Sequence, residues 1–327
     1  MLSQDIVQDV RALREAVTLD DLYQALTPLD MTPGWIQRKE PILRSEPHTP
    51  FRPMHWSYAN CKAALDAAGR LINTELAERR NLILVNPIDG NQYSTAKTLV
   101  NAYQMILPGE KARTHRHAPH ALRVIVESEG SYSVVNGEKH PMETGDIVLT
   151  PGWCWHGHGH DGDNPAYWLD GLDVPLTHLL EPMFFEEHPD GFEEIERITP
   201  DSPYRFTWES IQRRLEQVTP DPDGYFGRRV RLQADEMPTI GIYVQRLDAG
   251  QTTRKFRHSA NLVYSPMLGS GTSFINGLEI NWSRGDTMVV PTWHWIEHCV
   301  EEDTVLFSMT DEYLMRFANY YRFEAAA

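Results

Sequence analysis

The most restrictive feature of the sequence is an internal repeat. The dipeptides Asn136-Gly137 and Gly145-Asp146 return 140 residues later as Asn276-Gly277 and Gly285-Asp286. Five further positions recur 140 or 141 residues apart: Pro151, Trp153 and His158 match Pro291, Trp293 and His298, while Gly109 and His117 match Gly250 and His258. A single one-residue insertion or deletion accounts for both separations, so we expect two copies of one domain.

Each copy has the residue pattern of short β-strands. Runs rich in β-branched and apolar residues, such as Ala121–Val126, Tyr132–Val135, Ile147–Thr150 and Tyr167–Leu169, are separated by turn residues. Asn136-Gly137 predicts a two-residue hairpin, because a type I′ turn needs positive φ at both central positions. Short strands with turns at regular intervals favour a β-sandwich or barrel.

The remaining segments are predicted to be helical or irregular. Thr18 and Asp21 form a capping-box pattern, and an Ala-rich helix is expected between Ser57 and Gly69. A further helix is predicted from Trp208 to Gln217, inside an acidic, Pro-rich linker. We therefore divide the chain into a helical N-terminal region (1–80), a first β domain (81–180), a linker with a helix (181–228) and a second β domain (229–327).

Composition excludes several classes of protein. The chain has 30 Lys and Arg against 46 Asp and Glu, a net charge of −16, which argues against nucleic-acid binding. No apolar run approaches the roughly 18 residues of a membrane helix, and the N-terminus is charged where a signal peptide would be apolar. Cys61, Cys154 and Cys299 are too few for a disulfide framework. We expect a cytoplasmic protein without a membrane partner.

Half of the histidines lie in one short window. Of 14 in the chain, seven fall within it: His115, His117, His120, His140, His156, His158 and His160. Such a cluster is typical of a metal or proton-transfer site. His115 and His117 are two residues apart, so on a β-strand their side chains share one face. We predict that they bind a metal together with His156; the alternative is a set of structural histidines on a polar face.

The spacing around these ligands resembles the two motifs of the cupin superfamily. His-x-His is followed by Gly145, Pro151 and His156 in the order Gly-x5-Pro-x4-His. The resemblance implies a mainly β bicupin, with two double-stranded β-helix (jelly-roll) domains and a helical N-terminal region. The common cupin carboxylate ligand is absent, since Ala121 and Leu122 occupy its positions. Three neutral imidazoles suit Fe(II), Zn(II), Cu(II) or Ni(II).

The second copy lacks two of the three ligands. His258 matches His117, but Phe256 or Arg257 stands in place of His115, and Ile296 stands in place of His156. We therefore expect one metal ion per chain, held by the first copy.

A set of motifs narrows the resemblance to one group of bicupins. These motifs are Ala77–Arg80, Asn86-Pro87, Gln104, Leu107–Glu110, His115–His117, Ala121–Arg123, Thr150–His156 and Trp168–Asp173. Together they resemble the gentisate 1,2-dioxygenase family, which includes salicylate and 1-hydroxy-2-naphthoate 1,2-dioxygenases. The resemblance implies Fe(II), O2 as co-substrate, a small aromatic acid with an ortho hydroxyl group, ring cleavage between the carboxyl-bearing and hydroxyl-bearing carbons, and a homotetramer.

Arg123 is the first candidate for binding the substrate carboxylate. It lies six residues after His117, so along a strand it shares the face of the ligands. A buried guanidinium needs an anion, which a carboxylate supplies with two hydrogen bonds. The alternative is an ion pair with a structural acid.

Other site residues come from the resemblance alone. It implies that the pocket includes Arg79, Gln104, Asp170 and Ala102, and that His158 has a catalytic role. Whether Arg79 or Arg80 faces the pocket stays open, and His120 stands where the resemblance implies a small polar residue. The repeat partner of His158, His298, survives in the copy without ligands, which indicates a partly structural role.

Three classes of function are compatible with these residues. The first is a ring-cleaving dioxygenase whose substrate is gentisate or, as the alternative, salicylate, a 5-substituted salicylate or 1-hydroxy-2-naphthoate. The second is another cupin enzyme, such as an isomerase or a manganese decarboxylase. The third is a cupin that binds a small molecule without catalysis. The complete ligand trio and Arg123 favour the first.

Overall fold

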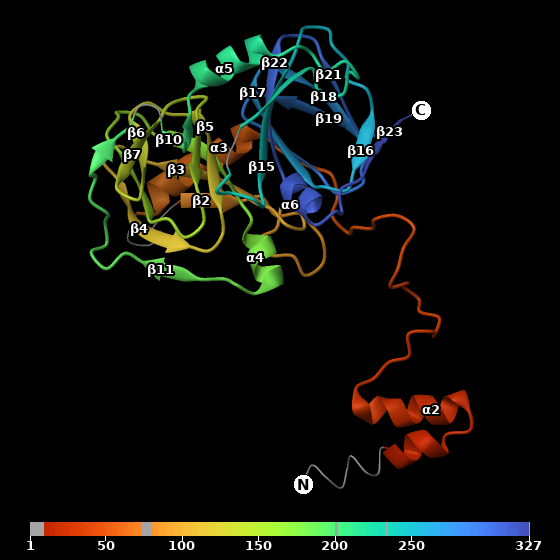
Figure 1. Cartoon of the computed structure of the whole chain (residues 1–327). Coiled ribbons are helices and arrows are strands. Elements are labelled where there is room, and N and C mark those ends of the chain that lie inside the picture. The colour runs from red at the N-terminus through yellow and green to blue at the C-terminus, as the bar shows by residue number, and fades with distance from the viewer. Residues whose placement is uncertain (1–9, 74–79, 200–201, 233–234, 327) are drawn as a thin grey trace. The chain divides into compact units, whose positions relative to one another are not determined.

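The computed structural model describes residues 10–73, 80–199, 202–232 and 235–326, and the chain divides into two compact units after Glu46. The first unit, Met1–Glu46, contains helix α2 (Leu19–Leu26) and the short 3₁₀ helix η1 (Thr27–Leu29) (Figure 1). The backbone N–H of Asp21 donates to the Thr18 hydroxyl, and the N–H of Thr18 donates to the Asp21 carboxylate. This reciprocal pair confirms the predicted capping box.

The second unit, Pro47–Ala327, contains two β barrels, each made of an inner and an outer sheet (Figure 1). We call the sheet that faces the other barrel the inner sheet and the remaining sheet the outer sheet. In the first barrel the inner sheet has the order β13-β8-β5-β10-β3-β2 and the outer sheet the order β11-β4-β9-β6-β7-β12. These strands are β2 (Arg80–Ile83), β3 (Val100–Ile106), β4 (Lys111–His117), β5 (Ala121–Glu127), β6 (Ser131–Val135), β7 (Glu138–Met142), β8 (Ile147–Thr150), β9 (His156–His160), β10 (Ala166–Leu172), β11 (Phe185–Glu187), β12 (Arg197–Ile198) and β13 (Arg205–Phe206).

The second barrel repeats this arrangement. Its inner sheet has the order β1-β20-β17-β22-β15-β14 and its outer sheet the order β19-β18-β21-β16-β23. The strands are β1 (Met54–Trp56), β14 (Arg228–Arg231), β15 (Gly241–Leu247), β16 (Phe256–His258), β17 (Leu262–Leu268), β18 (Ser270–Ile275), β19 (Leu278–Ser283), β20 (Thr287–Val290), β21 (Ile296–Val300), β22 (Thr304–Thr310) and β23 (Phe323–Ala325). Two barrels in one chain confirm the bicupin expected from the repeat.

The described part of this unit also contains four helices: α3 (Tyr58–Leu71), α4 (Val174–Leu180), α5 (Trp208–Gln217) and α6 (Glu312–Phe317). The bounds of α5 are those predicted, and its two buried residues, Ile211 and Leu215, are one turn apart. The longest described helix, α3, has 14 residues, and the described part of the chain contains no helix long and apolar enough to cross a membrane.

The two barrels share one core between their inner sheets. Along β5 the side chains alternate, so Leu122 and Val124 point out of the first barrel and pack in a cluster that includes Val263 and Phe307 of the second. Ile125, on the opposite face of β5, belongs to the separate interior cluster of the first barrel. The period of two therefore decides which residues join the barrels and which face the interior.

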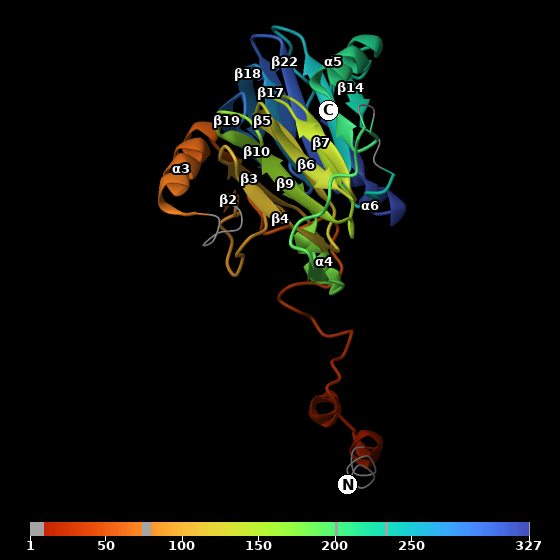
Figure 2. The ribbon, with the colours of Figure 1, turned by 90° about the vertical axis from the view of Figure 1, so that its left-hand side faces the viewer.

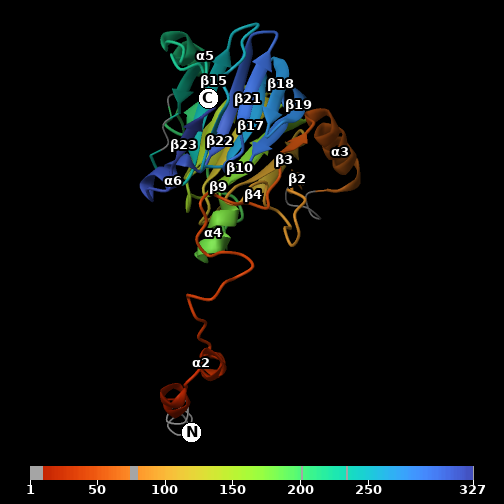
Figure 3. The same cartoon turned by 90° about the vertical axis from the view of Figure 1, so that its right-hand side faces the viewer.

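Two strand–helix arms dock reciprocally on the barrels. β1 and α3 precede the first barrel in the chain, yet β1 pairs with β20 of the second. β13 and α5 precede the second barrel, yet β13 pairs with β8 of the first. Figures 2 and 3 show α3 and α5 on opposite sides of this unit. The strand of each arm therefore pairs with the barrel of the other repeat, whereas the helix packs on the barrel that follows it in the chain: α3 on β2 and β3, and α5 on β14 and β15.

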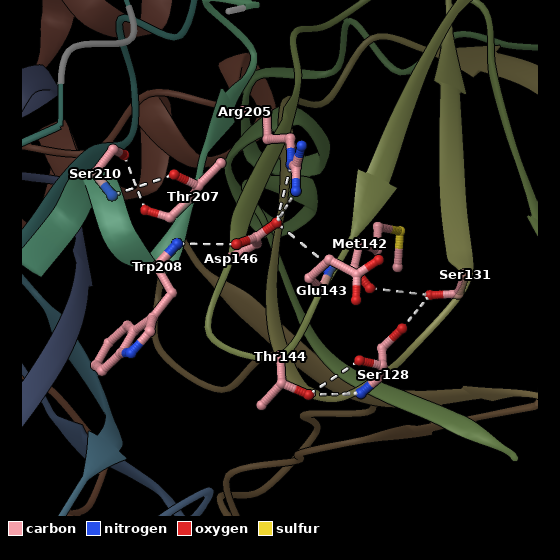
Figure 4. Close-up of polar contacts among 10 residues, drawn as sticks. All are labelled: Ser128, Ser131, Met142, Glu143, Thr144, Asp146, Arg205, Thr207, Trp208 and Ser210. Atoms are coloured by element: carbon pink, nitrogen blue, oxygen red, sulfur yellow. Dashed lines mark hydrogen bonds and ion pairs between the residues drawn. The ribbon is translucent and has the colours of Figure 1, made fainter. Parts of the chain in front are cut away.

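The Gly-Asp turn of the first barrel receives the arm formed by β13 and α5. Asp146 accepts hydrogen bonds from the backbone N–H of Trp208 (2.9 Å) and from the Arg205 guanidinium (2.6 Å) (Figure 4). A Cβ atom on Gly145 would lie 2.9 Å from the Trp208 ring, and φ at this position is 90°. Glycine is the residue that allows both the positive φ and the close approach.

The equivalent turn of the second barrel receives β1 and α3 in the same way. Asp286 accepts hydrogen bonds from the backbone N–H of Tyr58 and from the His55 ring, both at 2.8 Å. A Cβ atom on Gly285 would lie 2.9 Å from the Tyr58 ring. The repeated Gly-Asp dipeptide therefore marks a docking point for a helix N-terminus in both barrels.

The arms also change how the predicted regions relate to the structure. The helical segment expected over 1–80 is divided at Glu46, because α3 buries Tyr58, Cys61 and Leu65 in the core of the second unit. Within the predicted linker 181–228, β11, β12 and β13 extend the two sheets of the first barrel. The domain bounds given above stay predictions.

Candidate metal centre

Neighbouring strands of the outer sheet bring three histidines together in the first barrel. β4 pairs with β9 so that His115 lies opposite His156, after a bulge that begins at Ala112. His117 follows two residues later on the same face. One ring nitrogen from each of the three histidines lies within 4.8 Å of the others, and His115 and His156 are buried. This group can hold a metal ion.

The remaining ring nitrogens are oriented by backbone carbonyl groups. Nδ1 of His117 lies 2.8 Å from the Pro119 oxygen, and Nδ1 of His156 lies 3.0 Å from the Cys154 oxygen. Nδ1 of His115 is 3.3 Å from the Arg113 oxygen. Because a carbonyl oxygen only accepts, each Nδ1 carries the proton and each Nε2 presents a lone pair.

His156 is the most buried of the three ligands, and its chemistry fits a metal. Its Nε2 is buried and has no hydrogen-bond partner among the described residues. Burial holds the pKa of His156 well below its ordinary value, and the neighbouring His117, Arg123 and His115 lower this pKa further. The ring is therefore neutral, which is the form that binds a cation.

A cavity of about 390 Å³ adjoins this group. Its lining contains one metal ligand, His117, and four of the predicted substrate-binding residues, Ala102, Gln104, Arg123 and Asp170. The other lining residues are Asn81, Ile83, Tyr93, Val100, Ala121, Leu172 and Val174. The structure therefore places the predicted substrate contacts beside the histidine trio, in an otherwise mostly apolar cavity.

Arg123 is buried and held by two side chains of the same barrel. Its Nη1 donates to the Thr150 hydroxyl at 2.6 Å, and its Nε lies 3.5 Å from a carboxylate oxygen of Asp170. Asp170 also accepts a hydrogen bond from the Trp168 indole at 3.0 Å. A guanidinium has five N–H donors, so Arg123 can bind these partners and a substrate carboxylate together.

Comparison with known proteins identifies the family. A family model described as a cupin domain matches residues 102–172. Gentisate 1,2-dioxygenase 1 of Aquipseudomonas alcaligenes is 32% identical over 94% of this chain and 97% of its own length. 5-Aminosalicylate 1,2-dioxygenase of a Comamonas species is 34% identical over 94% and 91%. The chain belongs to the gentisate and salicylate 1,2-dioxygenase family.

The fold of this dioxygenase matches that of solved members. The crystal structure of salicylate 1,2-dioxygenase from Pseudoaminobacter salicylatoxidans with gentisate superposes with a TM-score of 0.84 at 27% identity, covering 96% of this chain and 95% of that one. The resemblance inferred from the motifs is therefore confirmed over nearly the whole chain.

Other candidate residues lie elsewhere in the dioxygenase. The His158 ring centre is 6.4 Å from that of His156 and 5.4 Å from the Trp168 ring, and His158 borders a separate cavity of about 60 Å³. Its catalytic role stays a prediction. Arg79 lies outside the described residues. Arg80 forms a buried two-hydrogen-bond ion pair with Glu110 (2.6 and 2.7 Å), so it is not the pocket arginine.

Several residues that shape the dioxygenase site were not predicted from the sequence. Thr150 belongs to one of the family motifs, but its contact with Arg123 depends on how β5 and β8 are paired. Tyr93 comes from a loop without hydrophobic periodicity, and Val174 begins α4. No local pattern predicts that these two side chains line one cavity.

The second barrel shows why its copy of the site differs. Phe256 pairs with Ile296 as His115 pairs with His156, so Phe256 rather than Arg257 occupies the position of His115. Among the described residues, the trio in the first barrel is the one cluster of three or more His, Cys, Asp or Glu side chains close enough to share a metal ion.

Proposed function

We propose that this chain is an Fe(II)-dependent dioxygenase that cleaves the ring of monocyclic ortho-hydroxybenzoates. Among these compounds we propose gentisate as the substrate. The observation that carries this proposal is the position of the trio His115, His117 and His156 at a cavity that is also lined by Arg123. The curated relatives include enzymes named for gentisate and for 5-aminosalicylate. We propose one iron per chain, because the second barrel retains one ligand position of three.

Bound Fe(II) would supply a template and Lewis acid on which the substrate oxygens and O2 meet. The residues of the chain then have distinct tasks. The three neutral imidazoles leave the charge of the cation uncompensated, which favours an anionic hydroxybenzoate. Arg123 binds the carboxylate and orients the ring, and Gln104 and Asp170 offer polar contacts along the same wall.

The proposed reaction consumes no further oxidant or reductant. The bond between the carboxyl-bearing and hydroxyl-bearing carbons breaks, and both atoms of O2 enter the product. With gentisate the product is maleylpyruvate. The apolar wall formed by Ile83, Val100, Ala102, Leu172 and Val174 faces the ring and excludes water from it.

The polar residues of the cavity lining bear on the alternative substrates. Apart from Gln104, His117, Arg123 and Asp170, the polar residues of the lining are Asn81 and Tyr93. A second ring hydroxyl, as in gentisate, can hydrogen-bond to one of them, whereas salicylate and 5-substituted salicylates need no such partner. These compounds and 1-hydroxy-2-naphthoate are the alternatives to gentisate.

An oxygen-electrode screen tests this function. Fe(II)-loaded protein is supplied with gentisate, salicylate, 5-substituted salicylates and 1-hydroxy-2-naphthoate, with catechol as the control that lacks the carboxylate. We expect rapid O2 uptake with at least one hydroxybenzoate and little with catechol. If no hydroxybenzoate supports O2 uptake, the alternatives of another cupin enzyme or a binding protein gain support.

We also propose a cytoplasmic homotetramer. The exposed apolar side chains between residues 179 and 198 support the assembly, because such a group is typical of an interface: Leu179, Leu180, Phe184, Phe185, Phe192, Ile195 and Ile198. The three cysteines support the compartment, because Cys61, Cys154 and Cys299 are free thiols, as expected in a reducing environment. Light scattering of the active protein tests the assembly, and a stable active monomer would contradict it.

A further inference from the structure

The turn that follows the second ligand controls the orientation of that ligand. Residues 118–120 connect β4 to β5, and the ring of His117 donates to the Pro119 carbonyl oxygen at 2.8 Å. The backbone N–H of Trp153 donates to the His117 carbonyl at 2.7 Å, and the N–H of Ala118 donates to the Phe184 carbonyl. A displacement of this turn therefore moves or rotates the His117 ring.

His120 fixes the far end of the turn. Its Nδ1 accepts a hydrogen bond from the backbone N–H of Gly152 at 2.9 Å, and its own backbone N–H donates to the Asp173 carboxylate at 2.8 Å. A Cβ atom on Gly152 would lie 2.4 Å from the Ala118 carbonyl oxygen, so the two segments are in close contact. The His120 imidazole thus ties the ligand turn to the loop after β8.

Asp173 extends this connection to the second barrel. It is buried, and one carboxylate oxygen accepts the hydrogen bond of His120. The other oxygen accepts a hydrogen bond from the hydroxyl of Thr239, which lies two residues before β15. A continuous series of hydrogen bonds therefore runs from the second barrel through Asp173 and His120 to the turn that holds His117.

We propose that His120 and Asp173 are positioning residues for the metal ligand His117, and that Thr239 of the second barrel anchors them. Neither His120 nor Asp173 lines the cavity of about 390 Å³, so both act through the ligand and not on the substrate. The inference rests on the proposed role of the histidine trio in holding Fe(II). It gives the second barrel, which lacks two ligands, a part in the metal site of the first.

Metal affinity is the readout that separates positioning from stability. Each variant is titrated anaerobically with Fe(II) against a competing chelator, and the visible absorption of the Co(II)-loaded protein is recorded. We expect His120→Ala to weaken Fe(II) binding by about 10–100-fold, the usual effect of removing a group that orients a ligand. His120→Asn should lose less, because its amide oxygen can accept a hydrogen bond. Thr239→Val should weaken binding less than His120→Ala and shift the Co(II) spectrum in the same direction.

His160 provides the matched control. It is buried in the same barrel, and its ring likewise binds a backbone group, the Asn164 carbonyl at 2.5 Å, in a turn away from His117. We expect His160→Asn to lower the melting temperature while the Kd for Fe(II) and the Co(II) spectrum stay unchanged.

Two results would overturn the inference. One is a His120→Ala protein whose Kd for Fe(II) stays within twofold of the Kd of the wild-type protein. The other is a Thr239→Val protein with unchanged affinity and spectrum, which would show that the second barrel does not help to position His117. Failure of the proposed function is distinguishable, because a protein that binds Fe(II) but oxidises no hydroxybenzoate still yields the affinity comparison. A protein that binds no metal ion would overturn both.

Discussion

At the scale of single residues, hydrogen bonds within the protein fix the orientation of the site's side chains. Backbone carbonyl oxygens accept the Nδ1–H groups of His115, His117 and His156, so each Nε2 is left for a cation. Arg123 is held by Thr150 and Asp170 in one orientation at the cavity wall. These fixed hydrogen bonds reduce the ordering that a metal ion and a substrate must impose on the site.

Arg123→Ala should separate substrate binding from metal binding. We expect Fe(II) to remain bound, since Arg123 is no ligand, while the kcat/KM for gentisate falls. Loss of one partner of a buried charge pair costs about 2–5 kcal/mol, and each 1.36 kcal/mol is about tenfold. Arg123→Lys should recover part of the loss, because it keeps the charge without the planar fork.

Arg205→Ala is the control for Arg123→Ala. Arg205 is also an ion-paired arginine of the first barrel, but it binds Asp146 at the docked arm. The Arg205→Ala protein should lose stability and keep its affinity for the substrate. If Arg123→Ala loses iron and fold together, Arg123 is a structural partner of Asp170, and near-normal efficiency would place the carboxylate elsewhere.

Ala102→Val should change the choice of substrate. Ala102 lines the cavity, and added methyl groups in a packed site cost about 1–3 kcal/mol. We expect kcat/KM for the two-ring 1-hydroxy-2-naphthoate to fall about tenfold more than that for gentisate. Ala166→Val, at a buried alanine away from the cavity, should leave the ratio of the two kcat/KM values unchanged. An unchanged ratio in Ala102→Val would show that this wall does not contact the ring.

At the scale of elements, the Gly-Asp turns have the same task in both repeats. Asp146 binds the first N–H of α5, and Asp286 binds the first N–H of α3. A carboxylate at a helix N-terminus also interacts favourably with the helix dipole. The partners on the preceding strand differ, since Arg205 binds Asp146 whereas His55 binds Asp286.

Removing these carboxylates should destabilise the protein to different extents. Asp146→Ala leaves the mostly buried Arg205 without its acid, and we expect a loss of about 3–5 kcal/mol in the free energy of unfolding. Asp286→Ala leaves a ring and a backbone N–H, with an expected loss of about 1–3 kcal/mol. Asp161→Ala removes an exposed ion pair with Lys139 and should cost less than 1 kcal/mol. Urea unfolding measures all three, and equal losses at the three positions would contradict the docking role.

At the scale of the whole molecule, the two barrels have the same architecture but different interiors. The first presents three ligands at a cavity, whereas the second pairs Phe256 with Ile296 at the equivalent position. The second still contributes the inner sheet that packs against the first, the β20 edge that receives β1, and the Thr239 hydroxyl. Its retained role is therefore structural support.

Metal analysis should give one iron per chain. We expect His156→Ala to lose both iron and activity, because it removes the most buried ligand. His298→Ala, at the repeat position of His158 in the second barrel, should keep the full iron content. Two irons per chain, or an active His156→Ala protein with iron, would contradict the assignment. Manganese or nickel as the active metal would favour another cupin enzyme.

Stability should fall in mild acid because of histidines in the second barrel. Burial lowers the pKa of His258 and of His298 to about 4, from an ordinary value of 6.5. Above pH 6.5 both are neutral in the folded and unfolded chain. Between pH 6.5 and about 4 only the unfolded chain takes up these protons, so each histidine removes about 1.4 kcal/mol of stability per pH unit.

The metal-free protein is suited to this measurement. Its free energy of unfolding should decrease progressively from pH 6.5 to 4, and His298→Gln should lower the slope by the share of one histidine. The slope is informative even if the variant is less stable at neutral pH. A slope unchanged by His298→Gln would show that His298 takes up its proton equally in both states.

The sequence by itself determined the local features of this protein. Asn136-Gly137 adopts positive φ at both residues (47° and 76°), as the hairpin pattern predicts. Arg123 lines the cavity, but it lies on β5 and not on the strand of His117, so the predicted parity along one strand was wrong as its reason. The i, i+2 spacing did place His115 and His117 on one face of β4. These features depend on a few neighbouring residues, so their information is contained in short stretches of sequence.

Only the tertiary structure decided which of these stretches meet. The pairing of β4 with β9 sets His115 opposite His156, and the pairing of β5 with β10 sets Arg123 opposite Asp170. The crossing of the two arms and the contact of Thr239 with Asp173 likewise join distant segments. Such contacts depend on the packing of two barrels through a shared core, and no local period in the sequence records which sheet a strand or helix will join.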